Sequence, residues 1–526
     1  MNFPIQARST DQKFQTRGFA GPSLLELLQQ AGVPIKSSCL GKGICRQCRV
    51  KVESGVAAVS SADRKSFSEE RIREGWRLSC CIRPKTAISV FFPQAYVFGE
   101  IITVTRAPAS EIHWVCDLGT TGIEVMACDQ NGELIRIAAL SKSVVQGADI
   151  MTRLEYAQRN GVEPLFQKSA EQLNALVAKV NEAGQKNFGA TWNACGDSKK
   201  GFLAGNSAVT SFLARLEIAQ LAVAPYQPIT LESQTVALDH VTWTTLPLLT
   251  SFIGGDLFAG LFVLWTQAGG TAEAMSGNPW ILTDVGTNSE ILGWDGTKLW
   301  VSSTPAGPAF EGSNISIGMR AENGAITNPR LQTKPEGAGT SGDWTYSVIG
   351  GDTPKGICGS ALVQSVYEMV RGGVIKADGE VLREAGLAFT QGLSLSQDDI
   401  REFQLAKSAI RSGLDLVIEK MTVKPKTLYL AGAFGQNLPL DESRWLGMLP
   451  RMTTRTLGNS SLDGTLLWAQ ASGEKRKAFQ SWLNTVKMPF ELSLSDRFQD
   501  LFVKNMHLEA GPEADKAANN QERSPA

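Results

Sequence analysis

The first 92 residues carry a hydrophobic pattern that predicts one small α+β unit. Leucines at 24, 25, 27 and 28 recur at helical spacing after Ser23, a residue type suited to cap a helix. Residues 49–53 alternate between polar and apolar side chains, as a half-buried strand does, and the apolar run over 88–93 predicts a further strand. A cysteine-rich loop lies between the helix and the first of these strands. This order of elements predicts a small α+β roll.

The rest of the chain divides into three segments by pattern. Residues 93–112 contain prolines, a glycine and a threonine-rich patch, and predict a linker. Over 113–505 short β runs alternate with longer helical patterns, which is typical of an α/β fold. Residues 506–526 are predicted to be a disordered tail, because the chain from 509 onward is polar and contains two prolines.

A weak internal duplication divides the α/β segment. Residues 114–125 and 280–291 share one design: an apolar strand, an aspartate, a Gly-Thr turn and a second strand. The repeat predicts two halves of similar size, with lobes at about 113–279 and 280–505.

Composition and charge exclude several classes of protein. The chain has 526 residues, 43% of them hydrophobic and 20% charged, as in ordinary soluble proteins of two or more domains. Its 51 basic and 52 acidic residues argue against nucleic acid as the main partner. The most apolar stretch, 246–265, is interrupted by Asp256 and a glycine pair, which argues against a membrane span. The N-terminus lacks the pattern of a signal peptide, so we expect a cytoplasmic protein.

The cysteine loop has the spacing of an iron–sulfur site. Three cysteines follow one another with five and then two residues between them, and a fourth lies downstream. Gly41 and Gly43 give the loop the freedom to turn its N–H groups toward the sulfurs. A zinc ribbon is the alternative, but it would normally show two Cys-x-x-Cys pairs, and only one is present. Cys80 and Cys81 are adjacent, so Cys81 is the alternative to Cys80 as the fourth ligand. The predicted ligands are Cys39, Cys45, Cys48 and Cys80.

Two Asp-x-Gly-Thr turns predict a phosphate-binding site. Each places an aspartate at the end of a strand, followed by backbone N–H groups that can bind phosphate oxygens. We expect Asp117 and Asp284 to hold Mg²⁺, with water between, and to orient an attacking water. A third element, a strand leading into Gly432-x-x-Gly435, would let the backbone approach an adenosine. The predicted ATP contacts are Gly119, Thr120, Thr121, Gly286, Thr287, Asn288, Gly432, Ala433 and Gly435.

Two further acidic residues have alternative interpretations. Asp256 lies either near the cleft or at a helix N-cap. Glu311, in a loop rich in glycine and proline, contacts either the nucleotide or a partner, or it is a solvated loop residue.

The three nucleotide elements resemble the phosphate-1, phosphate-2 and adenosine motifs of the superfamily of acetate and sugar kinases, heat-shock chaperones and actin. With the N-terminal cysteine unit, the chain is similar to the reductive activators of corrinoid proteins. The resemblance implies a ferredoxin-like β-grasp domain over 1–92 and a two-lobed, actin-like, ribonuclease H-like ASKHA ATPase domain over 113–505. Ser207-Ala208 departs from the family pattern of two threonines. Further matching stretches are 205–210, 303–312, 356–360, 399–407 and 446–450.

The resemblance implies a function and a set of partners. The protein would pass one electron from a 2Fe–2S cluster to the Co(II) corrinoid of a partner methyltransferase or corrinoid protein and restore Co(I), with ATP and Mg²⁺ as further cofactors. An upstream low-potential reductant would supply the electron, and the sequence leaves open whether the protein is a homodimer. The alternatives are an activator of a 2-hydroxyacyl-CoA dehydratase-like enzyme and a redox-regulated small-molecule kinase.

Overall fold

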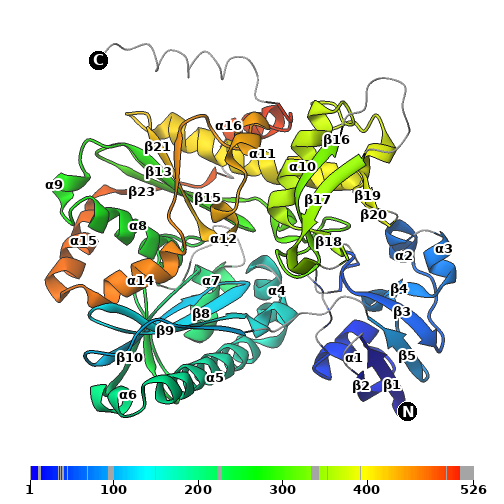
Figure 1. Cartoon of the computed structure of the whole chain (residues 1–526), viewed down its shortest axis with the longest axis horizontal. Helices are drawn as coiled ribbons and strands as arrows, with labels where there is room; N and C mark the ends of the chain where they lie inside the picture. The colour runs from blue at the N-terminus through cyan, green and yellow to red at the C-terminus, as the bar shows by residue number, and fades with distance from the viewer. Residues whose placement is uncertain are drawn as a thin grey trace. The chain divides into compact units, whose positions relative to one another are not determined.

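The computed structural model places the elements of the chain in two compact units (Figure 1), one formed by Met1–Thr230 with Gln234–Thr245 and the other by Leu231–Ser233 with Leu246–Ala526. Parts of the predicted linker (93–99) and tail (510–526) lie outside the described residues. The structure describes residues 2–9, 13–33, 35, 37, 39, 41–43, 45–67, 69–92, 100–147, 150–221, 228, 230–332, 343–351, 353–390, 392–492 and 495–509.

The N-terminal part of the first unit is a mixed sheet with one main helix. The strand order is β2-β1-β5-β3-β4, in which β1 pairs antiparallel with β2 and parallel with β5. The predicted helix is α1 (Leu24–Gln30), and all four leucines of its stripe are buried. It begins there because Ser23 and Glu26 form a reciprocal capping box. The other elements are β1 (Asn2–Arg8), β2 (Lys13–Phe19), β3 (Arg49–Ser54), α2 (Ser61–Ser66), α3 (Glu69–Arg73), β4 (Trp76–Leu78), η1 (Ser79–Cys81) and β5 (Ile88–Phe91).

A seven-stranded sheet forms the rest of the first unit, in the order β11-β12-β10-β7-β8-β9-β6. Its edge strand β6 pairs antiparallel with β9, so residues 100–104, within the predicted linker, form part of this sheet. The isolated threonine-rich pattern did not reveal this pairing. The strands are β6 (Glu100–Val104), β7 (Ile112–Leu118), β8 (Gly122–Asp129), β9 (Gly132–Leu140), β10 (Asp197–Gly205), β11 (Thr235–Ala237) and β12 (Thr242–Thr245).

One long helix covers this sheet. α5 runs alongside the strands (Figure 1), and its apolar side chains Leu173, Leu176, Val177 and Val180 join the core formed by the strands. Because apolar side chains recur at helical spacing along α5, one face is buried and the opposite face is left to solvent. The helices of this unit are η2 (Lys142–Gln146), α4 (Ile150–Asn160), α5 (Glu163–Phe188), α6 (Ala190–Cys195), α7 (Ser207–Leu213) and η3 (Ala219–Leu221).

The second unit repeats the strand arrangement of the first. β7, β8 and β9 form an antiparallel meander with β10 parallel to β7, while β13, β14 and β15 form the same meander with β21 parallel to β13. The predicted duplication is therefore a duplication of topology. The sheet has the order β22-β21-β13-β14-β15-β23. Its strands are β13 (Trp280–Val285), β14 (Asn288–Trp294), β15 (Leu299–Pro305), β21 (Thr427–Ala431), β22 (Thr453–Thr456) and β23 (Lys487–Pro489).

Two small sheets and several helices complete the second unit. β16 pairs with β17 and β18, and β19 pairs with β20. The strands are β16 (Ala325–Gln332), β17 (Asp343–Val348), β18 (Gly356–Ile357), β19 (Ala388–Thr390) and β20 (Leu393–Ser394). The helices are α8 (Gly255–Gln267), α9 (Ala272–Met275), η4 (Ala309–Glu311), η5 (Ile349–Gly351), α10 (Gly359–Arg371), η6 (Glu384–Leu387), α11 (Gln397–Lys420), α12 (Gly432–Gln436), α13 (Leu440–Trp445), α14 (Ser460–Gln470), α15 (Gly473–Val486) and α16 (Asp496–Lys504).

The apolar stretch over 246–265 is part of an aromatic cluster of this unit. Its helix α8 lies beside α14 and α15 (Figure 1), and Phe258 and Phe262 pack edge-on against Trp468 and Phe479 at 5.0–5.2 Å between ring centroids. No helix among the described residues is long and apolar enough to cross a membrane. Because of this packing, α8 belongs to the second unit. The boundary between the two units therefore lies near residue 245, ahead of the predicted lobe boundary at 280.

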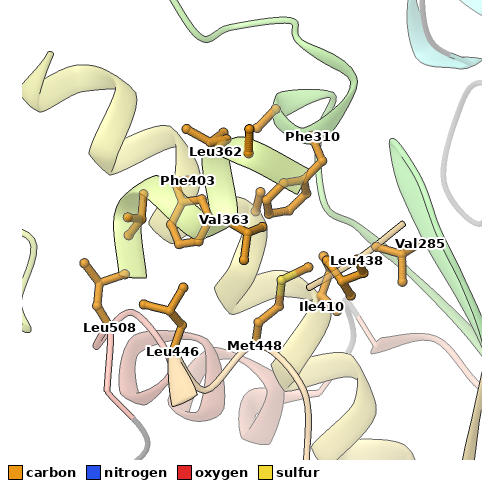
Figure 2. Packing of buried hydrophobic residues seen from close by; sticks show 14 of the residues in the cluster. Val285, Phe310, Leu362, Val363, Phe403, Ile410, Leu438, Leu446, Met448 and Leu508 are labelled. Atoms are coloured by element: carbon orange, nitrogen blue, oxygen red, sulfur yellow. The ribbon is translucent and has the colours of Figure 1, made fainter. Parts of the chain in front are cut away.

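The first residues of the predicted tail are packed in the second unit. Leu508 is fully buried, and Figure 2 shows it beside Leu446 at the edge of the main core. The buried Lys407 ammonium donates hydrogen bonds to the carbonyls of Asn505, at 2.7 Å, and of His507. Burial lowers the pKa of Lys407 to about 7. Residues 506–508 are thus ordered, because α11 supplies donors for the carbonyls that follow α16.

Candidate functional site

The cysteine loop brings the four predicted ligands into the interior of the N-terminal sheet domain. Cys39, Cys45, Cys48 and Cys80 are each at most 6% exposed, and none forms a disulfide. The loop can turn this tightly because Gly41 and Gly43 have φ of +85° and +75°. The backbone N–H of Ser79 donates to the Cys48 carbonyl at 2.8 Å, which ties the downstream cysteine to the loop.

The four thiols form two pairs. The Cys39 thiol lies against Cys45, and the Cys80 thiol lies against Cys48. The contact with Cys39, together with burial, raises the pKa of Cys45, whereas hydrogen bonds from the thiol and the backbone N–H of Cys80 lower the pKa of Cys48 despite its burial. Among the described residues no group of three or more His, Cys, Asp or Glu side chains is arranged around one metal position. Two pairs of soft sulfur donors fit a cluster of two irons with two cysteines each.

The two adjacent cysteines differ in their surroundings. Cys80 is buried against Cys48, while Cys81 is partly exposed and its Sγ lies 3.8 Å from the Sγ of Cys80. Cys80, rather than Cys81, therefore lies buried with the other predicted ligands.

The first predicted phosphate loop connects β7 to β8. Asp117 is near the end of β7, and Gly119, Thr120 and Thr121 form the turn. Arg153, 1% exposed, donates from Nη2 to the Thr120 carbonyl and from Nε to the Gly147 carbonyl at 2.9 Å. A buried guanidinium therefore holds the backbone of this loop.

A second buried side chain fixes the same turn. The Asn206 amide donates from Nδ2 to Thr120 Oγ1 at 2.6 Å, and its Oδ1 accepts from the backbone N–H of Val209 as the N-cap of α7. Sequence reasoning assigned no role to Asn206 or Arg153. The matching stretch 205–210 was the only signal for Asn206, and nothing in the spacing marked Arg153.

The second predicted phosphate loop connects β13 to β14. Asp284 lies near the end of β13, followed by Gly286 and Thr287 and by Asn288, which opens β14. Both the backbone N–H and the hydroxyl of Thr287 donate to Oε1 of Glu311, at 2.9 and 2.8 Å. Glu311 thus contacts the donors that were expected to bind phosphate.

The predicted adenosine element meets this loop. β21 runs parallel to β13 with Ala431 in register with Asp284, and α12 begins at Gly432 and contains Ala433 and Gly435. Gly432 has φ of +77°, and a Cβ at this position would be 2.1 Å from Oδ1 of Asp284. Only glycine permits this approach, so the second unit brings Asp284 and the glycine turn together.

Three other carboxylates act electrostatically on Glu290 near this point. Glu290 faces Asp284 directly across β13 and β14. Burial, and then the charges of Asp256, Asp284 and Glu311, raise the pKa of Glu290. Burial also raises the pKa of Asp256 to about 6. Like charges placed opposite each other in a sheet are unfavourable, so a cation or a proton would stabilise this arrangement.

The same pairing occurs in the first unit. There Glu124 lies opposite Asp117 across β7 and β8. Both glutamates occupy equivalent positions in the duplicated sequence pattern, but no role was assigned to them from the sequence. The N-cap interpretation of Asp256 is wrong: Gly254 is the N-cap of α8, and Asp256 lies in its first turn, where its Oδ1 accepts from the N–H of Leu257 at 2.8 Å.

Three family models match successive parts of the chain. A 2Fe–2S iron–sulfur cluster binding domain matches residues 10–85, the RACo middle region matches 114–267, and the C-terminal ASKHA domain of RACo matches 278–516. The chain belongs to the RACo family. A solved structure titled as a reductive activator for corrinoid, iron–sulfur protein shares the fold, with a TM-score of 0.60 and 20% identity over 96% of this chain and 98% of that chain.

Two curated relatives are corrinoid-linked proteins. The chain is 26% identical over 434 residues to the corrinoid activation enzyme RamQ of Eubacterium limosum, which covers 74% of this chain and 69% of the relative. It is 28% identical over 211 residues to the [Co(II) methylated amine-specific corrinoid protein] reductase of Methanosarcina barkeri, which covers 35% of this chain and 37% of the relative.

Proposed function

We propose that this RACo-family chain is an ATP-dependent reductive activator. It would transfer one electron from a 2Fe–2S cluster to the Co(II) corrinoid of a partner methyltransferase or corrinoid protein and so restore Co(I). The observation that carries the proposal is the presence, on one chain, of two buried thiol pairs and two topologically matched Asp-x-Gly-Thr loops. The names of the two curated relatives, a corrinoid activation enzyme and a corrinoid protein reductase, support the same chemistry.

The cluster would be held by Cys39 and Cys45 on one iron and by Cys48 and Cys80 on the other. When bound, it supplies a carrier that takes up and gives up a single electron. Burial of the four cysteines keeps water from the sulfurs and allows a low potential. Exchange of that electron with an upstream low-potential reductant fits a reducing cytoplasm, in which free thiols persist.

ATP would be bound by the two phosphate loops and the glycine turn. Asp117 and Asp284 would hold Mg²⁺ through water, because Mg²⁺ gives up its water reluctantly. Within each unit a glutamate lies opposite the aspartate, Glu124 beside Asp117 and Glu290 beside Asp284, and adds negative charge next to it. ATP can drive the transfer only if it binds two states of the complex with different affinity.

The test follows the redox state of cobalt. The purified protein with its cluster is mixed anaerobically with a Co(II) corrinoid protein and a reductant, and the absorbance of Co(I) is recorded with and without Mg·ATP. We expect Co(I) to accumulate only with Mg·ATP. Equal accumulation without ATP would refute the coupling, and failure to form Co(I) under either condition would refute the assignment of this partner class.

A further inference from the structure

The Glu311 side chain contacts the phosphate loop as a bound anion would. We infer that Glu311 is an internal competitor for the phosphate position of the second loop, and that nucleotide binding displaces its carboxylate. This inference rests on the proposed ATP site and concerns the regulation of that site.

The contacts of Thr287 carry the inference. Its backbone N–H and its hydroxyl both donate to the same carboxylate oxygen, at 2.9 and 2.8 Å. A Cβ on Gly286 would be 3.6 Å from that oxygen, so the carboxylate lies directly against the turn. Carboxylate and phosphate oxygens are both anionic acceptors that seek the same N–H and O–H donors. One pair of donors cannot serve both, so phosphate can bind Thr287 only after Glu311 leaves.

The surrounding charge favours this exchange. The charges of Asp256, Asp284 and Glu311 all raise the pKa of Glu290, so these four carboxylates lie in one region of the second unit. A phosphate entering this region adds negative charge close to Glu311. As the phosphate and its cation approach, this repulsion favours departure of the Glu311 carboxylate from Thr287, which frees the two donors.

The backbone beneath Glu311 is fixed, so the motion is confined to its side chain. Glu311 is the last residue of η4, and its neighbour Phe310 points into the core beside Phe403 and Val363 (Figure 2). The Phe310 ring stacks on Phe434 at 4.8 Å and packs edge-on against Phe403 at 5.6 Å between centroids. Gly312 has φ of +83°, so the chain turns away immediately after Glu311. The Glu311 carboxylate consequently moves by rotation of its side chain, and it can return to Thr287 when the nucleotide leaves.

The stack on Phe434 links the two nucleotide elements. Phe434 belongs to α12, the short helix that begins at Gly432 beside Asp284. The residue that supports Glu311 therefore also supports the adenosine element. Competition at the phosphate loop weakens nucleotide binding and so aids nucleotide release.

The experiment compares Mg·ATP affinity in full-length variants. Replacing Glu311 with alanine removes a charged acceptor of two hydrogen bonds, so we expect E311A to bind Mg·ATP about tenfold more tightly than the wild type. E311Q keeps a neutral acceptor and should fall between the two. Glu273→Ala, an exposed carboxylate on α9, is the matched control and should leave the affinity unchanged. Weaker or equal binding by E311A would overturn the inference, since it would make Glu311 a ligand or a bystander.

A second measurement separates this inference from the proposed function. Hydrogen exchange of the Thr287 amide without nucleotide should be faster in E311A than in the wild type, because its acceptor is gone. If exchange does not change, the contact does not hold the loop and the inference fails. If the wild type and all three variants bind no Mg·ATP, the proposed function fails, and with it the competition, even where exchange at Thr287 responds to the substitution.

Discussion

Asp256 provides a sharp test of how burial affects the carboxylates of the second unit. It is the second residue of α8, and its carboxyl accepts from the N–H of Leu257 at 2.8 Å. Burial raises its pKa from 3.8 to about 6, although the backbone N–H groups around it favour the charged form. The substitution Asp256→Asn keeps the shape and the acceptor oxygen but removes the charge.

The size of the expected change in stability follows from the pKa of Asp256. At about 1.4 kcal/mol per pKa unit, ionised Asp256 destabilises the fold at neutral pH by about 3 kcal/mol. This is an upper bound, since the residue keeps some access to solvent. Because folding raises the pKa, the folded state binds more protons than the unfolded state between pH 3.8 and about 6. Wild-type stability therefore falls as the pH rises through this range, and the substitution removes that loss.

The assay is thermal unfolding of the full chain by calorimetry from pH 4 to 8. We expect Asp256→Asn to raise the unfolding temperature of the second unit at pH 8 by up to about 6–12 °C, and the two proteins to converge near pH 4. The matched control is Asp441→Asn, the second residue of α13, which is exposed and should shift the temperature little. A gain that is independent of pH, or a loss of stability at pH 8, would contradict the reasoning.

Four further substitutions test the separate parts of the site. Cys48→Ser should abolish the visible absorption of the cluster after anaerobic reconstitution yet leave Mg·ATP binding intact, whereas Cys81→Ser should retain the absorption. Gly432→Ala places a methyl group 2.1 Å from the Asp284 carboxylate at φ of +77°, so we expect a loss of about 1–3 kcal/mol in unfolding free energy and of Mg·ATP affinity, measured by denaturation and equilibrium binding. Asn206→Ala removes the cap of α7 and should cost about 1–2 kcal/mol by denaturation, with weaker Mg·ATP binding than the wild type.

The elements that were predicted correctly are those set by short-range pattern. The leucine stripe and Ser23 defined α1, because a capping box and a helical spacing are local properties. The repeated strand-Asp-Gly-Thr-strand pattern indicated two equivalent sheets, since each motif contains its own hairpin. The cysteine spacing likewise pointed to one buried loop, because three of the four predicted ligands lie within ten residues.

Elements that depend on pairing with distant segments were missed. Residues 100–104 were assigned to a linker, and only pairing with β9 makes them a strand. Residues 506–508 were assigned to a disordered tail, and only the buried Lys407 of α11 holds them in place. Neither partner can be identified from the local composition of the segment.

The sequence by itself determined which side chains are available for iron and phosphate chemistry, because motif spacing fixes local geometry. Tertiary structure alone decided that Glu311 contacts Thr287, that Gly432 touches Asp284, and that the thiols lie in two pairs. Apart from the pairing of Cys39 with Cys45 within one loop, these contacts join segments that are separated along the chain. They arise because core packing and strand register bring the segments together, and neither can be read from a local pattern.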